Sequence, residues 1–231
     1  MKTPDRNGFV VPLYTDCARF LRATYNNLPG GRLGAGHAHE LVAAYFGYSD
    51  GSALRAESKY PLTASDEADI LIPDIPRMAA RMHQLALPAG MPAAGDVAAA
   101  LTGFLTSGNH FTGRVWLTDN LEEYIGETFI QENAMIVMDE LSGEMASTNA
   151  YFDELYPEEV SLDHGSDELI ATVTGSLNGE NDPDRPFSGT SISFESVITF
   201  PRVAGRVFYA SPEIATGGAV ADKDMRDPDD M

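Results

Sequence analysis

The first half of the chain places apolar residues at helical spacing in short segments that Gly and Pro separate. Apolar positions three and four residues apart are typical of amphipathic helices, and Gly or Pro marks where such helices end. We expect Thr15 or Asp16 to cap the first helix. The pattern predicts helices over residues 15–28, 36–46, 50–54, 76–85 and 96–105.

The middle of the chain predicts one long helix. Asp119 is a suitable N-cap, and Glu122 stands three residues later, as in a capping box. Residues 134–141 fit either a continuation of this helix or a buried strand. The apolar stripe of the helix would consist of Leu121, Ile125, Phe129 and Ile136.

The last third of the chain alternates apolar and polar positions, the period of a half-buried strand. The pattern predicts strands over residues 160–162, 169–177, 191–200 and 204–209, after an earlier short one at 113–117. Short, Gly-containing connections favour antiparallel pairing. We therefore predict an α+β protein in which a helical N-terminal half precedes an acidic helix and an antiparallel β-sheet.

Composition shifts along the chain suggest three parts. Residues 1–62 would form a small helical domain, since Pro61 and a polar stretch follow its last helix. Residues 63–210 would form an acidic α+β domain. Residues 211–231 are first Gly-rich and then acidic, which is typical of a disordered tail.

Charge is distributed very unevenly over the 231 residues. The formal net charge is −20, and all of it arises in residues 119–231, because the preceding residues balance. Residues 115–184 contain 18 carboxylates and no Lys or Arg. A surface of one sign repels itself in the folded state. The carboxylates could serve solubility or life in a high-salt or acid-tolerant host, or they could form a surface that binds a basic partner.

The basic-partner interpretation leads to a specific hypothesis. The chain would be a non-enzymatic interaction protein whose acidic surface binds a basic protein, as a nucleic-acid mimic or an anti-defence or accessory protein of a mobile element would. Direct binding of nucleic acid by this half is excluded, because phosphates would be repelled. The partner-binding residues would be Glu122, Glu123, Glu127, Glu132, Asp139, Glu140 and Glu144.

A metal-dependent hydrolase or lyase that uses clustered carboxylates is the alternative. Helical pairs such as Glu123 with Glu127 lie one turn apart, but the Glu-x-x-His motif of di-metal bundles is absent. His37 and His39 are two residues apart. On a helix, side chains at this spacing point in different directions, so they could not bind one metal ion together. The loop of residues 178–184 contains carboxylates, but they do not follow the ligand spacing of an EF-hand calcium loop. We therefore predict no metal ligands, no catalytic residues and no cofactor.

The length of the apolar segments and the number of cysteines indicate where the protein is located in the cell. No segment is apolar for long enough to span a membrane, and no apolar stretch follows the first residues as a signal peptide requires. Cys17, the one cysteine, cannot form an internal disulfide, which fits a reducing compartment. We expect a cytoplasmic protein without a membrane partner.

The N-terminal segments also resemble a known family. Residues 17–22 read CARFLR, residues 40–43 ELVA and residues 46–48 FGY, followed by Leu54. This series resembles the small helical domain at the N-terminus of some glyoxalase-superfamily-related proteins. The resemblance covers about residues 15–60 and implies an accessory helical module without a reaction of its own. The resemblance would also imply the His/Glu metal site of that superfamily. We do not expect this site here, because His164 is the one histidine of the C-terminal half.

Overall fold

The computed structural model describes residues 12–148, 150–181 and 190–221, and the chain forms an α+β fold of two compact units. We call Met1–Asn120 with Pro201–Ser211 the helical unit, and Leu121–Phe200 with Pro212–Met231 the acidic unit. The chain passes from the acidic unit into the helical unit within strand β5 (Ser191–Ala204), between Phe200 and Pro201.

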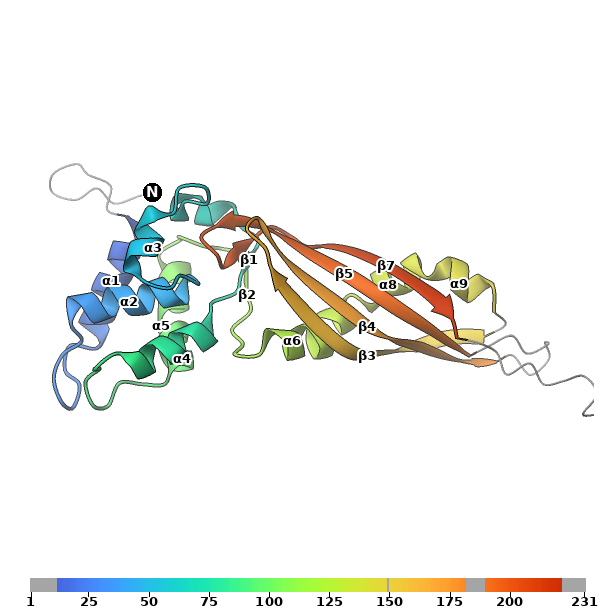
Figure 1. Cartoon of the computed structure of the whole chain (residues 1–231), viewed down its shortest axis with the longest axis horizontal. Helices are drawn as coiled ribbons and strands as arrows, with labels where there is room; N and C mark the ends of the chain where they lie inside the picture. The colour runs from blue at the N-terminus through green and yellow to red at the C-terminus, as the bar shows by residue number, and fades with distance from the viewer. Residues whose placement is uncertain (1–11, 149, 182–189, 222–231) are drawn as a thin grey trace, which may run out of the picture. The chain divides into compact units, whose positions relative to one another are not determined.

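The helical unit confirms the predicted N-terminal helices. Thr15 and Asp16 do not cap the first of them, however, because it already begins after Pro12, and both lie in its first turn. Asp50 caps the third helix, since its Oδ1 accepts from the backbone N–H groups of Ser52 and Ala53 at 2.8 Å each. The helices are α1 (Leu13–Thr24), α2 (Ala35–Tyr45), α3 (Gly51–Ala56), the 3-10 turn η1 (Leu62–Glu67), α4 (Ile75–Gln84) and α5 (Ala94–Ser107) (Figure 1).

Helix α2 forms the centre of the helical unit's core. Tyr45, fully buried, shares a hydrogen bond of 2.8 Å with the hydroxyl of Thr102 on α5, which satisfies both polar groups. The Phe46 ring packs on Phe208, with 6.0 Å between centroids. Cys17 is fully buried in the same core, and burial raises the pKa of its thiol far above the ordinary value. The thiol therefore acts as a small apolar group.

Short strands pair the segment Pro201–Ser211 with the first part of the helical unit. Strand β1 (Ile70–Leu71) pairs in parallel with β2 (Arg114–Val115) and antiparallel with β6 (Phe208–Tyr209). The backbone N–H of Gly205 donates to the carbonyl oxygen of Tyr60 at 2.7 Å. These bonds hold residues 201–211 within a unit whose other residues come from the first 120 positions.

The predicted long helix is a chain of shorter helices in the acidic unit. It begins at Leu121, one residue later than a cap at Asp119 would give, and is interrupted at Asn133 and Leu141. Residues 134–141, left open between helix and strand, are mainly helical. The segments are α6 (Leu121–Tyr124), the π-helical turn η2 (Ile125–Phe129), α7 (Ile130–Glu132), α8 (Ala134–Glu140) and α9 (Ser142–Ala146).

The sheet of the acidic unit has the order β7-β5-β4-β3, and its strands are antiparallel where their registers are described. Its strands are longer than predicted: β3 is Ala150–His164 and β4 is Glu168–Asn181. Within the acidic unit, the helices lie along the sheet (Figure 1). Buried side chains alternate along β5 at Ile192, Phe194, Ser196, Ile198 and Phe200.

Part of the expected tail belongs to this sheet. Residues Glu213–Val220 form β7 and pair with β5 from Ile192↔Val220 to Thr199↔Glu213, so the prediction of disorder from residue 211 is wrong for this stretch. Residues 222–231 lie outside the described residues. The compact helical unit continues past residue 62, as far as Asn120. The prediction that residues 1–62 fold as a domain of their own stays a prediction, because it concerns independent folding.

Candidate functional site

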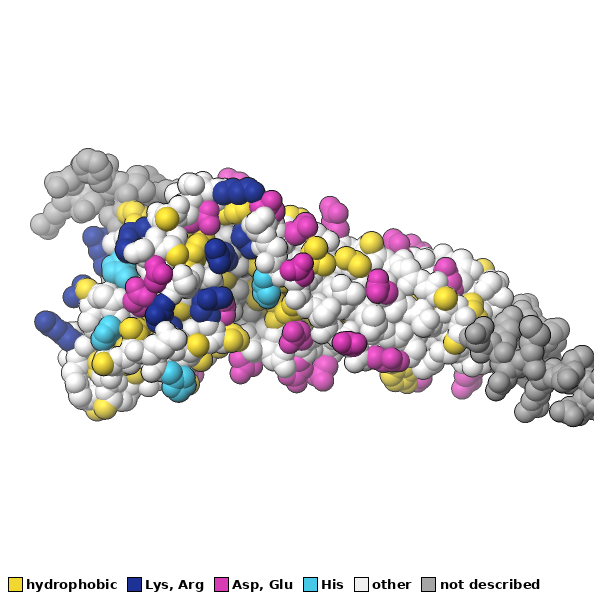
Figure 2. All heavy atoms as spheres, viewed as in Figure 1, with side chains coloured by type: hydrophobic (Ala, Val, Ile, Leu, Met, Phe, Trp, Pro, Cys, Tyr) yellow, Lys and Arg dark blue, Asp and Glu magenta, His cyan; other side chains and the backbone are white. Residues whose placement is uncertain are grey.

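The acidic unit presents carboxylates and, over its described residues, neither Lys nor Arg. Every described Lys and Arg belongs to the helical unit. Figure 2 shows this separation on one face: dark blue side chains lie over the helical unit, and magenta ones lie over the acidic unit. The described carboxylates of the acidic unit are Glu122, Glu123, Glu127, Glu132, Asp139, Glu140, Glu144, Asp153, Glu154, Glu158, Glu159, Asp163, Asp167, Glu168, Glu180, Glu195 and Glu213.

The seven residues predicted to bind a partner occupy four helices and the π turn rather than one continuous helix face. Glu144, on α9, is half-buried, in contrast to the other six. The six exposed ones are Glu122 and Glu123 on α6, Glu127 in η2, Glu132 on α7, and Asp139 and Glu140 on α8.

The π turn changes which residues face the sheet. One additional residue in a turn displaces later side chains by about 100° around the helix axis. Phe129 and its neighbour Ile130 are consequently both buried, and the Phe129 ring packs on Phe200 of β5 with 5.9 Å between centroids. Gly126 lies in this turn, where an added Cβ would stand 3.1 Å from Val160 Cγ2. Glycine thus allows a close approach of the turn to β3.

The predicted apolar stripe is correct at Ile125 and Phe129 and wrong at Ile136. After the interruption at Asn133, Val137 and Leu141 occupy the buried positions, whereas the Ile136 side chain is 47% exposed. The Asn133 side chain stabilises this interruption, because its Nδ2 donates to the carbonyl oxygen of Phe129 at 2.7 Å.

None of the seven residues predicted to bind a partner lies on strand β3. Exposed acids follow one another along this strand because two bulges, at Asp153 and Glu158, each place an additional residue opposite β4. The bulge at Asp153 separates the buried residues Phe152 and Leu155 by three positions, so the alternation that signals a strand is lost here. Bulges and charges also protect an edge strand from pairing with other chains.

An aromatic side chain is tied to one of these acids. The Tyr156 hydroxyl donates to Glu154 Oε2 at 2.6 Å, although the Tyr156 ring is 47% exposed. This hydrogen bond raises the pKa of Tyr156, and partial desolvation and the nearby negative charges of Glu154 and Asp153 act in the same direction. The pair orders two exposed side chains on β3.

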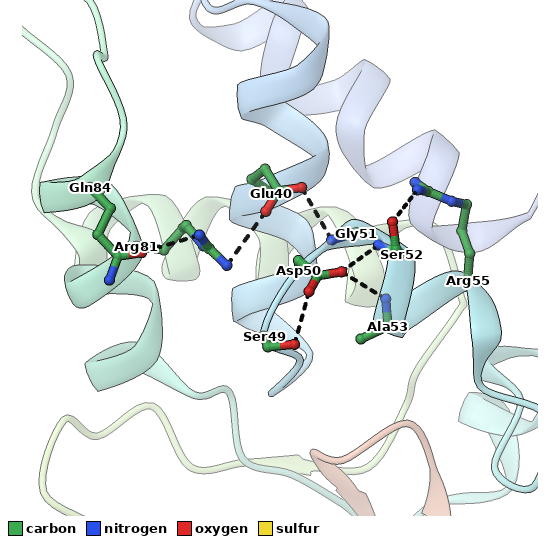
Figure 3. Close-up of polar contacts among 9 residues, drawn as sticks. All are labelled: Glu40, Ser49, Asp50, Gly51, Ser52, Ala53, Arg55, Arg81 and Gln84. Atoms are coloured by element: carbon green, nitrogen blue, oxygen red, sulfur yellow. Dashed lines mark hydrogen bonds and ion pairs between the residues drawn. The ribbon is translucent and has the colours of Figure 1, made fainter.

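The helical unit carries a separate polar network (Figure 3). Glu40 on α2 accepts from the backbone N–H of Gly51 at 3.2 Å and pairs with the Arg81 guanidinium on α4 at 3.6 Å. The Arg81 guanidinium also donates to Gln84 at 3.1 Å. Hydrogen bonds from Ala53, Ser49 and Ser52 hold the pKa of Asp50 below its ordinary value. These partners join α2, α3 and α4, which is a structural role.

The histidines considered as metal ligands lie in the first turns of α2. Partial burial, together with the cations Arg55 and Arg22, lowers the pKa of His39, whose ring contacts Tyr14 with 6.3 Å between centroids. The candidate loop 178–184 is partly strand, since β4 continues to Asn181, and residues 182–184 lie outside the described residues. Across the described residues, no three His, Cys, Asp or Glu side chains are grouped so that they could hold a metal ion.

Comparisons with models of known protein families, with curated proteins and with solved structures find no match to this chain. The resemblance of residues 15–60 to the glyoxalase-related helical domain therefore stays a prediction. Within the described part of the chain, no helix has both the length and the apolar character needed to cross a bilayer.

Proposed function

We propose that this chain is a non-enzymatic interaction protein whose acidic unit binds a basic partner protein in the cytoplasm. The observation that carries the proposal is the separation of charge: seventeen described carboxylates stand in the acidic unit, and all described Lys and Arg stand in the helical unit. The acidic unit thus has no Lys or Arg of its own among those residues to neutralise its field.

The arrangement of the carboxylates on ordered elements supports the proposal. Side chains fixed on a sheet and on helices lose less freedom upon binding than those of a flexible acidic tail. A field of one sign also accelerates encounter with a positive surface and makes association sensitive to salt. Proteins that bind nucleic acid carry such positive surfaces, which is why we propose this class as the partner.

No observation on the described residues favours the alternative of a carboxylate-dependent hydrolase or lyase. Such an enzyme would need a cluster of ligands around a metal ion, and the described side chains form no such cluster. The acids of the helices and of β3 are mostly exposed, where water screens their interactions with each other.

Competition for a basic DNA-binding protein tests the proposal. A lysine-rich histone is bound to labelled duplex DNA, and the full chain is added at about 50 mM and about 300 mM NaCl. We expect displacement of the DNA at low salt, with less displacement at high salt. An unstructured polyglutamate of matched total charge is the control and should compete less effectively at equal concentration. Equal competition by the polyglutamate, or no displacement by the chain at low salt, would contradict the proposal.

A further inference from the structure

Helix α8 exposes two large apolar side chains in the middle of the acidic unit. Met135 is 84% exposed and Ile136 is 47% exposed, and among the described helices of this unit these are the large hydrophobic side chains most open to water. The opposite side of α8 is packed, because Val137 and the following Leu141 are fully buried. The exposed pair is therefore not required to anchor the helix.

Acids surround this apolar pair along the helix. Asp139 follows Met135 by four residues and Glu140 follows Ile136 by four residues, so each acid lies one turn further along the same exposed face. Glu132 precedes the pair on α7 and is also exposed. The result is an apolar centre with carboxylates on both sides, the distribution that protein interfaces have between core and rim.

We propose that Met135 and Ile136 form the apolar centre of the docking surface and receive an amphipathic basic segment of the partner, in which an apolar side chain is flanked by Lys or Arg. The inference rests on the proposed function and specifies the chemistry of the partner. Charge complementarity selects this occupant over a second copy of the chain, which would bring Glu132, Asp139 and Glu140 against the same carboxylates. A flexible Met side chain suits a surface that adapts to its ligand.

Two synthetic peptides test this inference on the full chain. The first is helical, with Leu and Lys at spacings that produce one apolar and one basic face; in the second, Gln replaces every Leu. The double variant M135Q/I136Q preserves helix propensity. The variant L117Q is the control, because Leu117 is 45% exposed in the helical unit. Circular dichroism confirms that both variants fold, and peptide affinity is measured by fluorescence anisotropy.

We expect M135Q/I136Q to bind the Leu/Lys peptide about tenfold more weakly than the parent does, with unchanged affinity for the Gln/Lys peptide. L117Q should bind both peptides as the parent does. In protein with labelled Met methyl groups, the Met135 signal should shift with the first peptide and not with the second.

Equal binding of the Leu/Lys peptide by M135Q/I136Q and parent would overturn the inference alone, because the proposed function requires only that basic probes bind. Self-association of the parent that M135Q/I136Q abolishes would overturn it in favour of a second copy. Failure of both peptides to bind the parent would count against the proposed function itself.

Discussion

Leu141, between α8 and α9, lies directly against the backbone of Gly218 in strand β7, so that an added Cβ at Gly218 would stand 2.6 Å from Leu141 Cδ2. Leu141 itself is fully buried. The contact joins the helical segments that carry Met135, Ile136, Asp139 and Glu140 to the last strand of the sheet. The absence of a side chain at Gly218 thus helps to position the proposed docking surface.

The substitution Gly218→Ala should destabilise the protein by about 1–3 kcal/mol, because overpacking at a buried contact forces neighbouring atoms to move. The added methyl group would also stand 2.8 Å from the carbonyl oxygen of Ser193. Urea denaturation followed by circular dichroism measures the change. Gly217→Ala is the matched control on the same strand, since an added Cβ there meets no atom within 4 Å. Equal stabilities of the two variants would show that the Leu141 contact is not close in solution.

The Asp50 cap of α3 should make stability depend on pH in the acid range. Hydrogen bonds from Ala53, Ser49 and Ser52 lower the pKa of this carboxyl below its ordinary value of 3.8. Its stabilisation is therefore fully present above that ordinary value and is lost as the pH falls through the lower folded-state value. We expect Asp50→Ala to lower the melting temperature at pH 7 and to differ less from the parent near pH 3. Asp50→Asn should retain most of the cap at both pH values. A deficit of Asp50→Ala that persists unchanged at pH 3 would rule out the ionised cap as its cause.

Added salt should stabilise the protein, because screening reduces repulsion among the carboxylates of the acidic unit. Between about 10 and 500 mM NaCl we expect the melting temperature to rise by about 2–4 °C, the shift that corresponds to roughly 1 kcal/mol in a chain of this length. Calorimetry at pH 7 measures it, and a non-coordinating salt such as tetramethylammonium chloride is the control for specific sodium binding. A melting temperature that does not change with salt would show that the carboxylates are too far apart to repel each other.

Local signals explain why the helical unit could be predicted from the sequence. Asp50 is a strong N-cap, and Gly47, whose φ is +81°, ends α2 where a left-handed residue is needed. Strand β7 has no such signal, because Gly217 and Gly218 interrupt the alternation of its small residues. It forms because β5 offers a partner edge, a tertiary effect that local patterns do not contain.

The negative charge of the candidate site could be predicted from the sequence, but the exposure of individual side chains could be predicted only in part. The acidic composition of the second half led to the prediction that Glu122, Glu123, Glu127 and Glu132 belong to the binding surface, and all four are exposed. The π turn at Gly126 and the interruption at Asn133 both break the regular helical period, so the exposure of Ile136 could not be inferred from that period. The acids of β3 were missed for a similar reason, since bulges concealed the strand.

Removal of two exposed charges from the acidic unit tests whether this unit binds the basic partner. The variant E122Q/E127Q keeps side-chain size and helix propensity on α6 and η2, and D66N/E67Q removes two exposed charges from η1 of the helical unit as a matched control. Association with the lysine-rich histone is followed by stopped-flow fluorescence at several salt concentrations. We predict that E122Q/E127Q lowers the association rate constant about threefold or more and flattens its salt dependence, while D66N/E67Q behaves more like the parent. Identical rates and salt dependences for E122Q/E127Q and D66N/E67Q would contradict the assignment of the acidic unit as the binding surface.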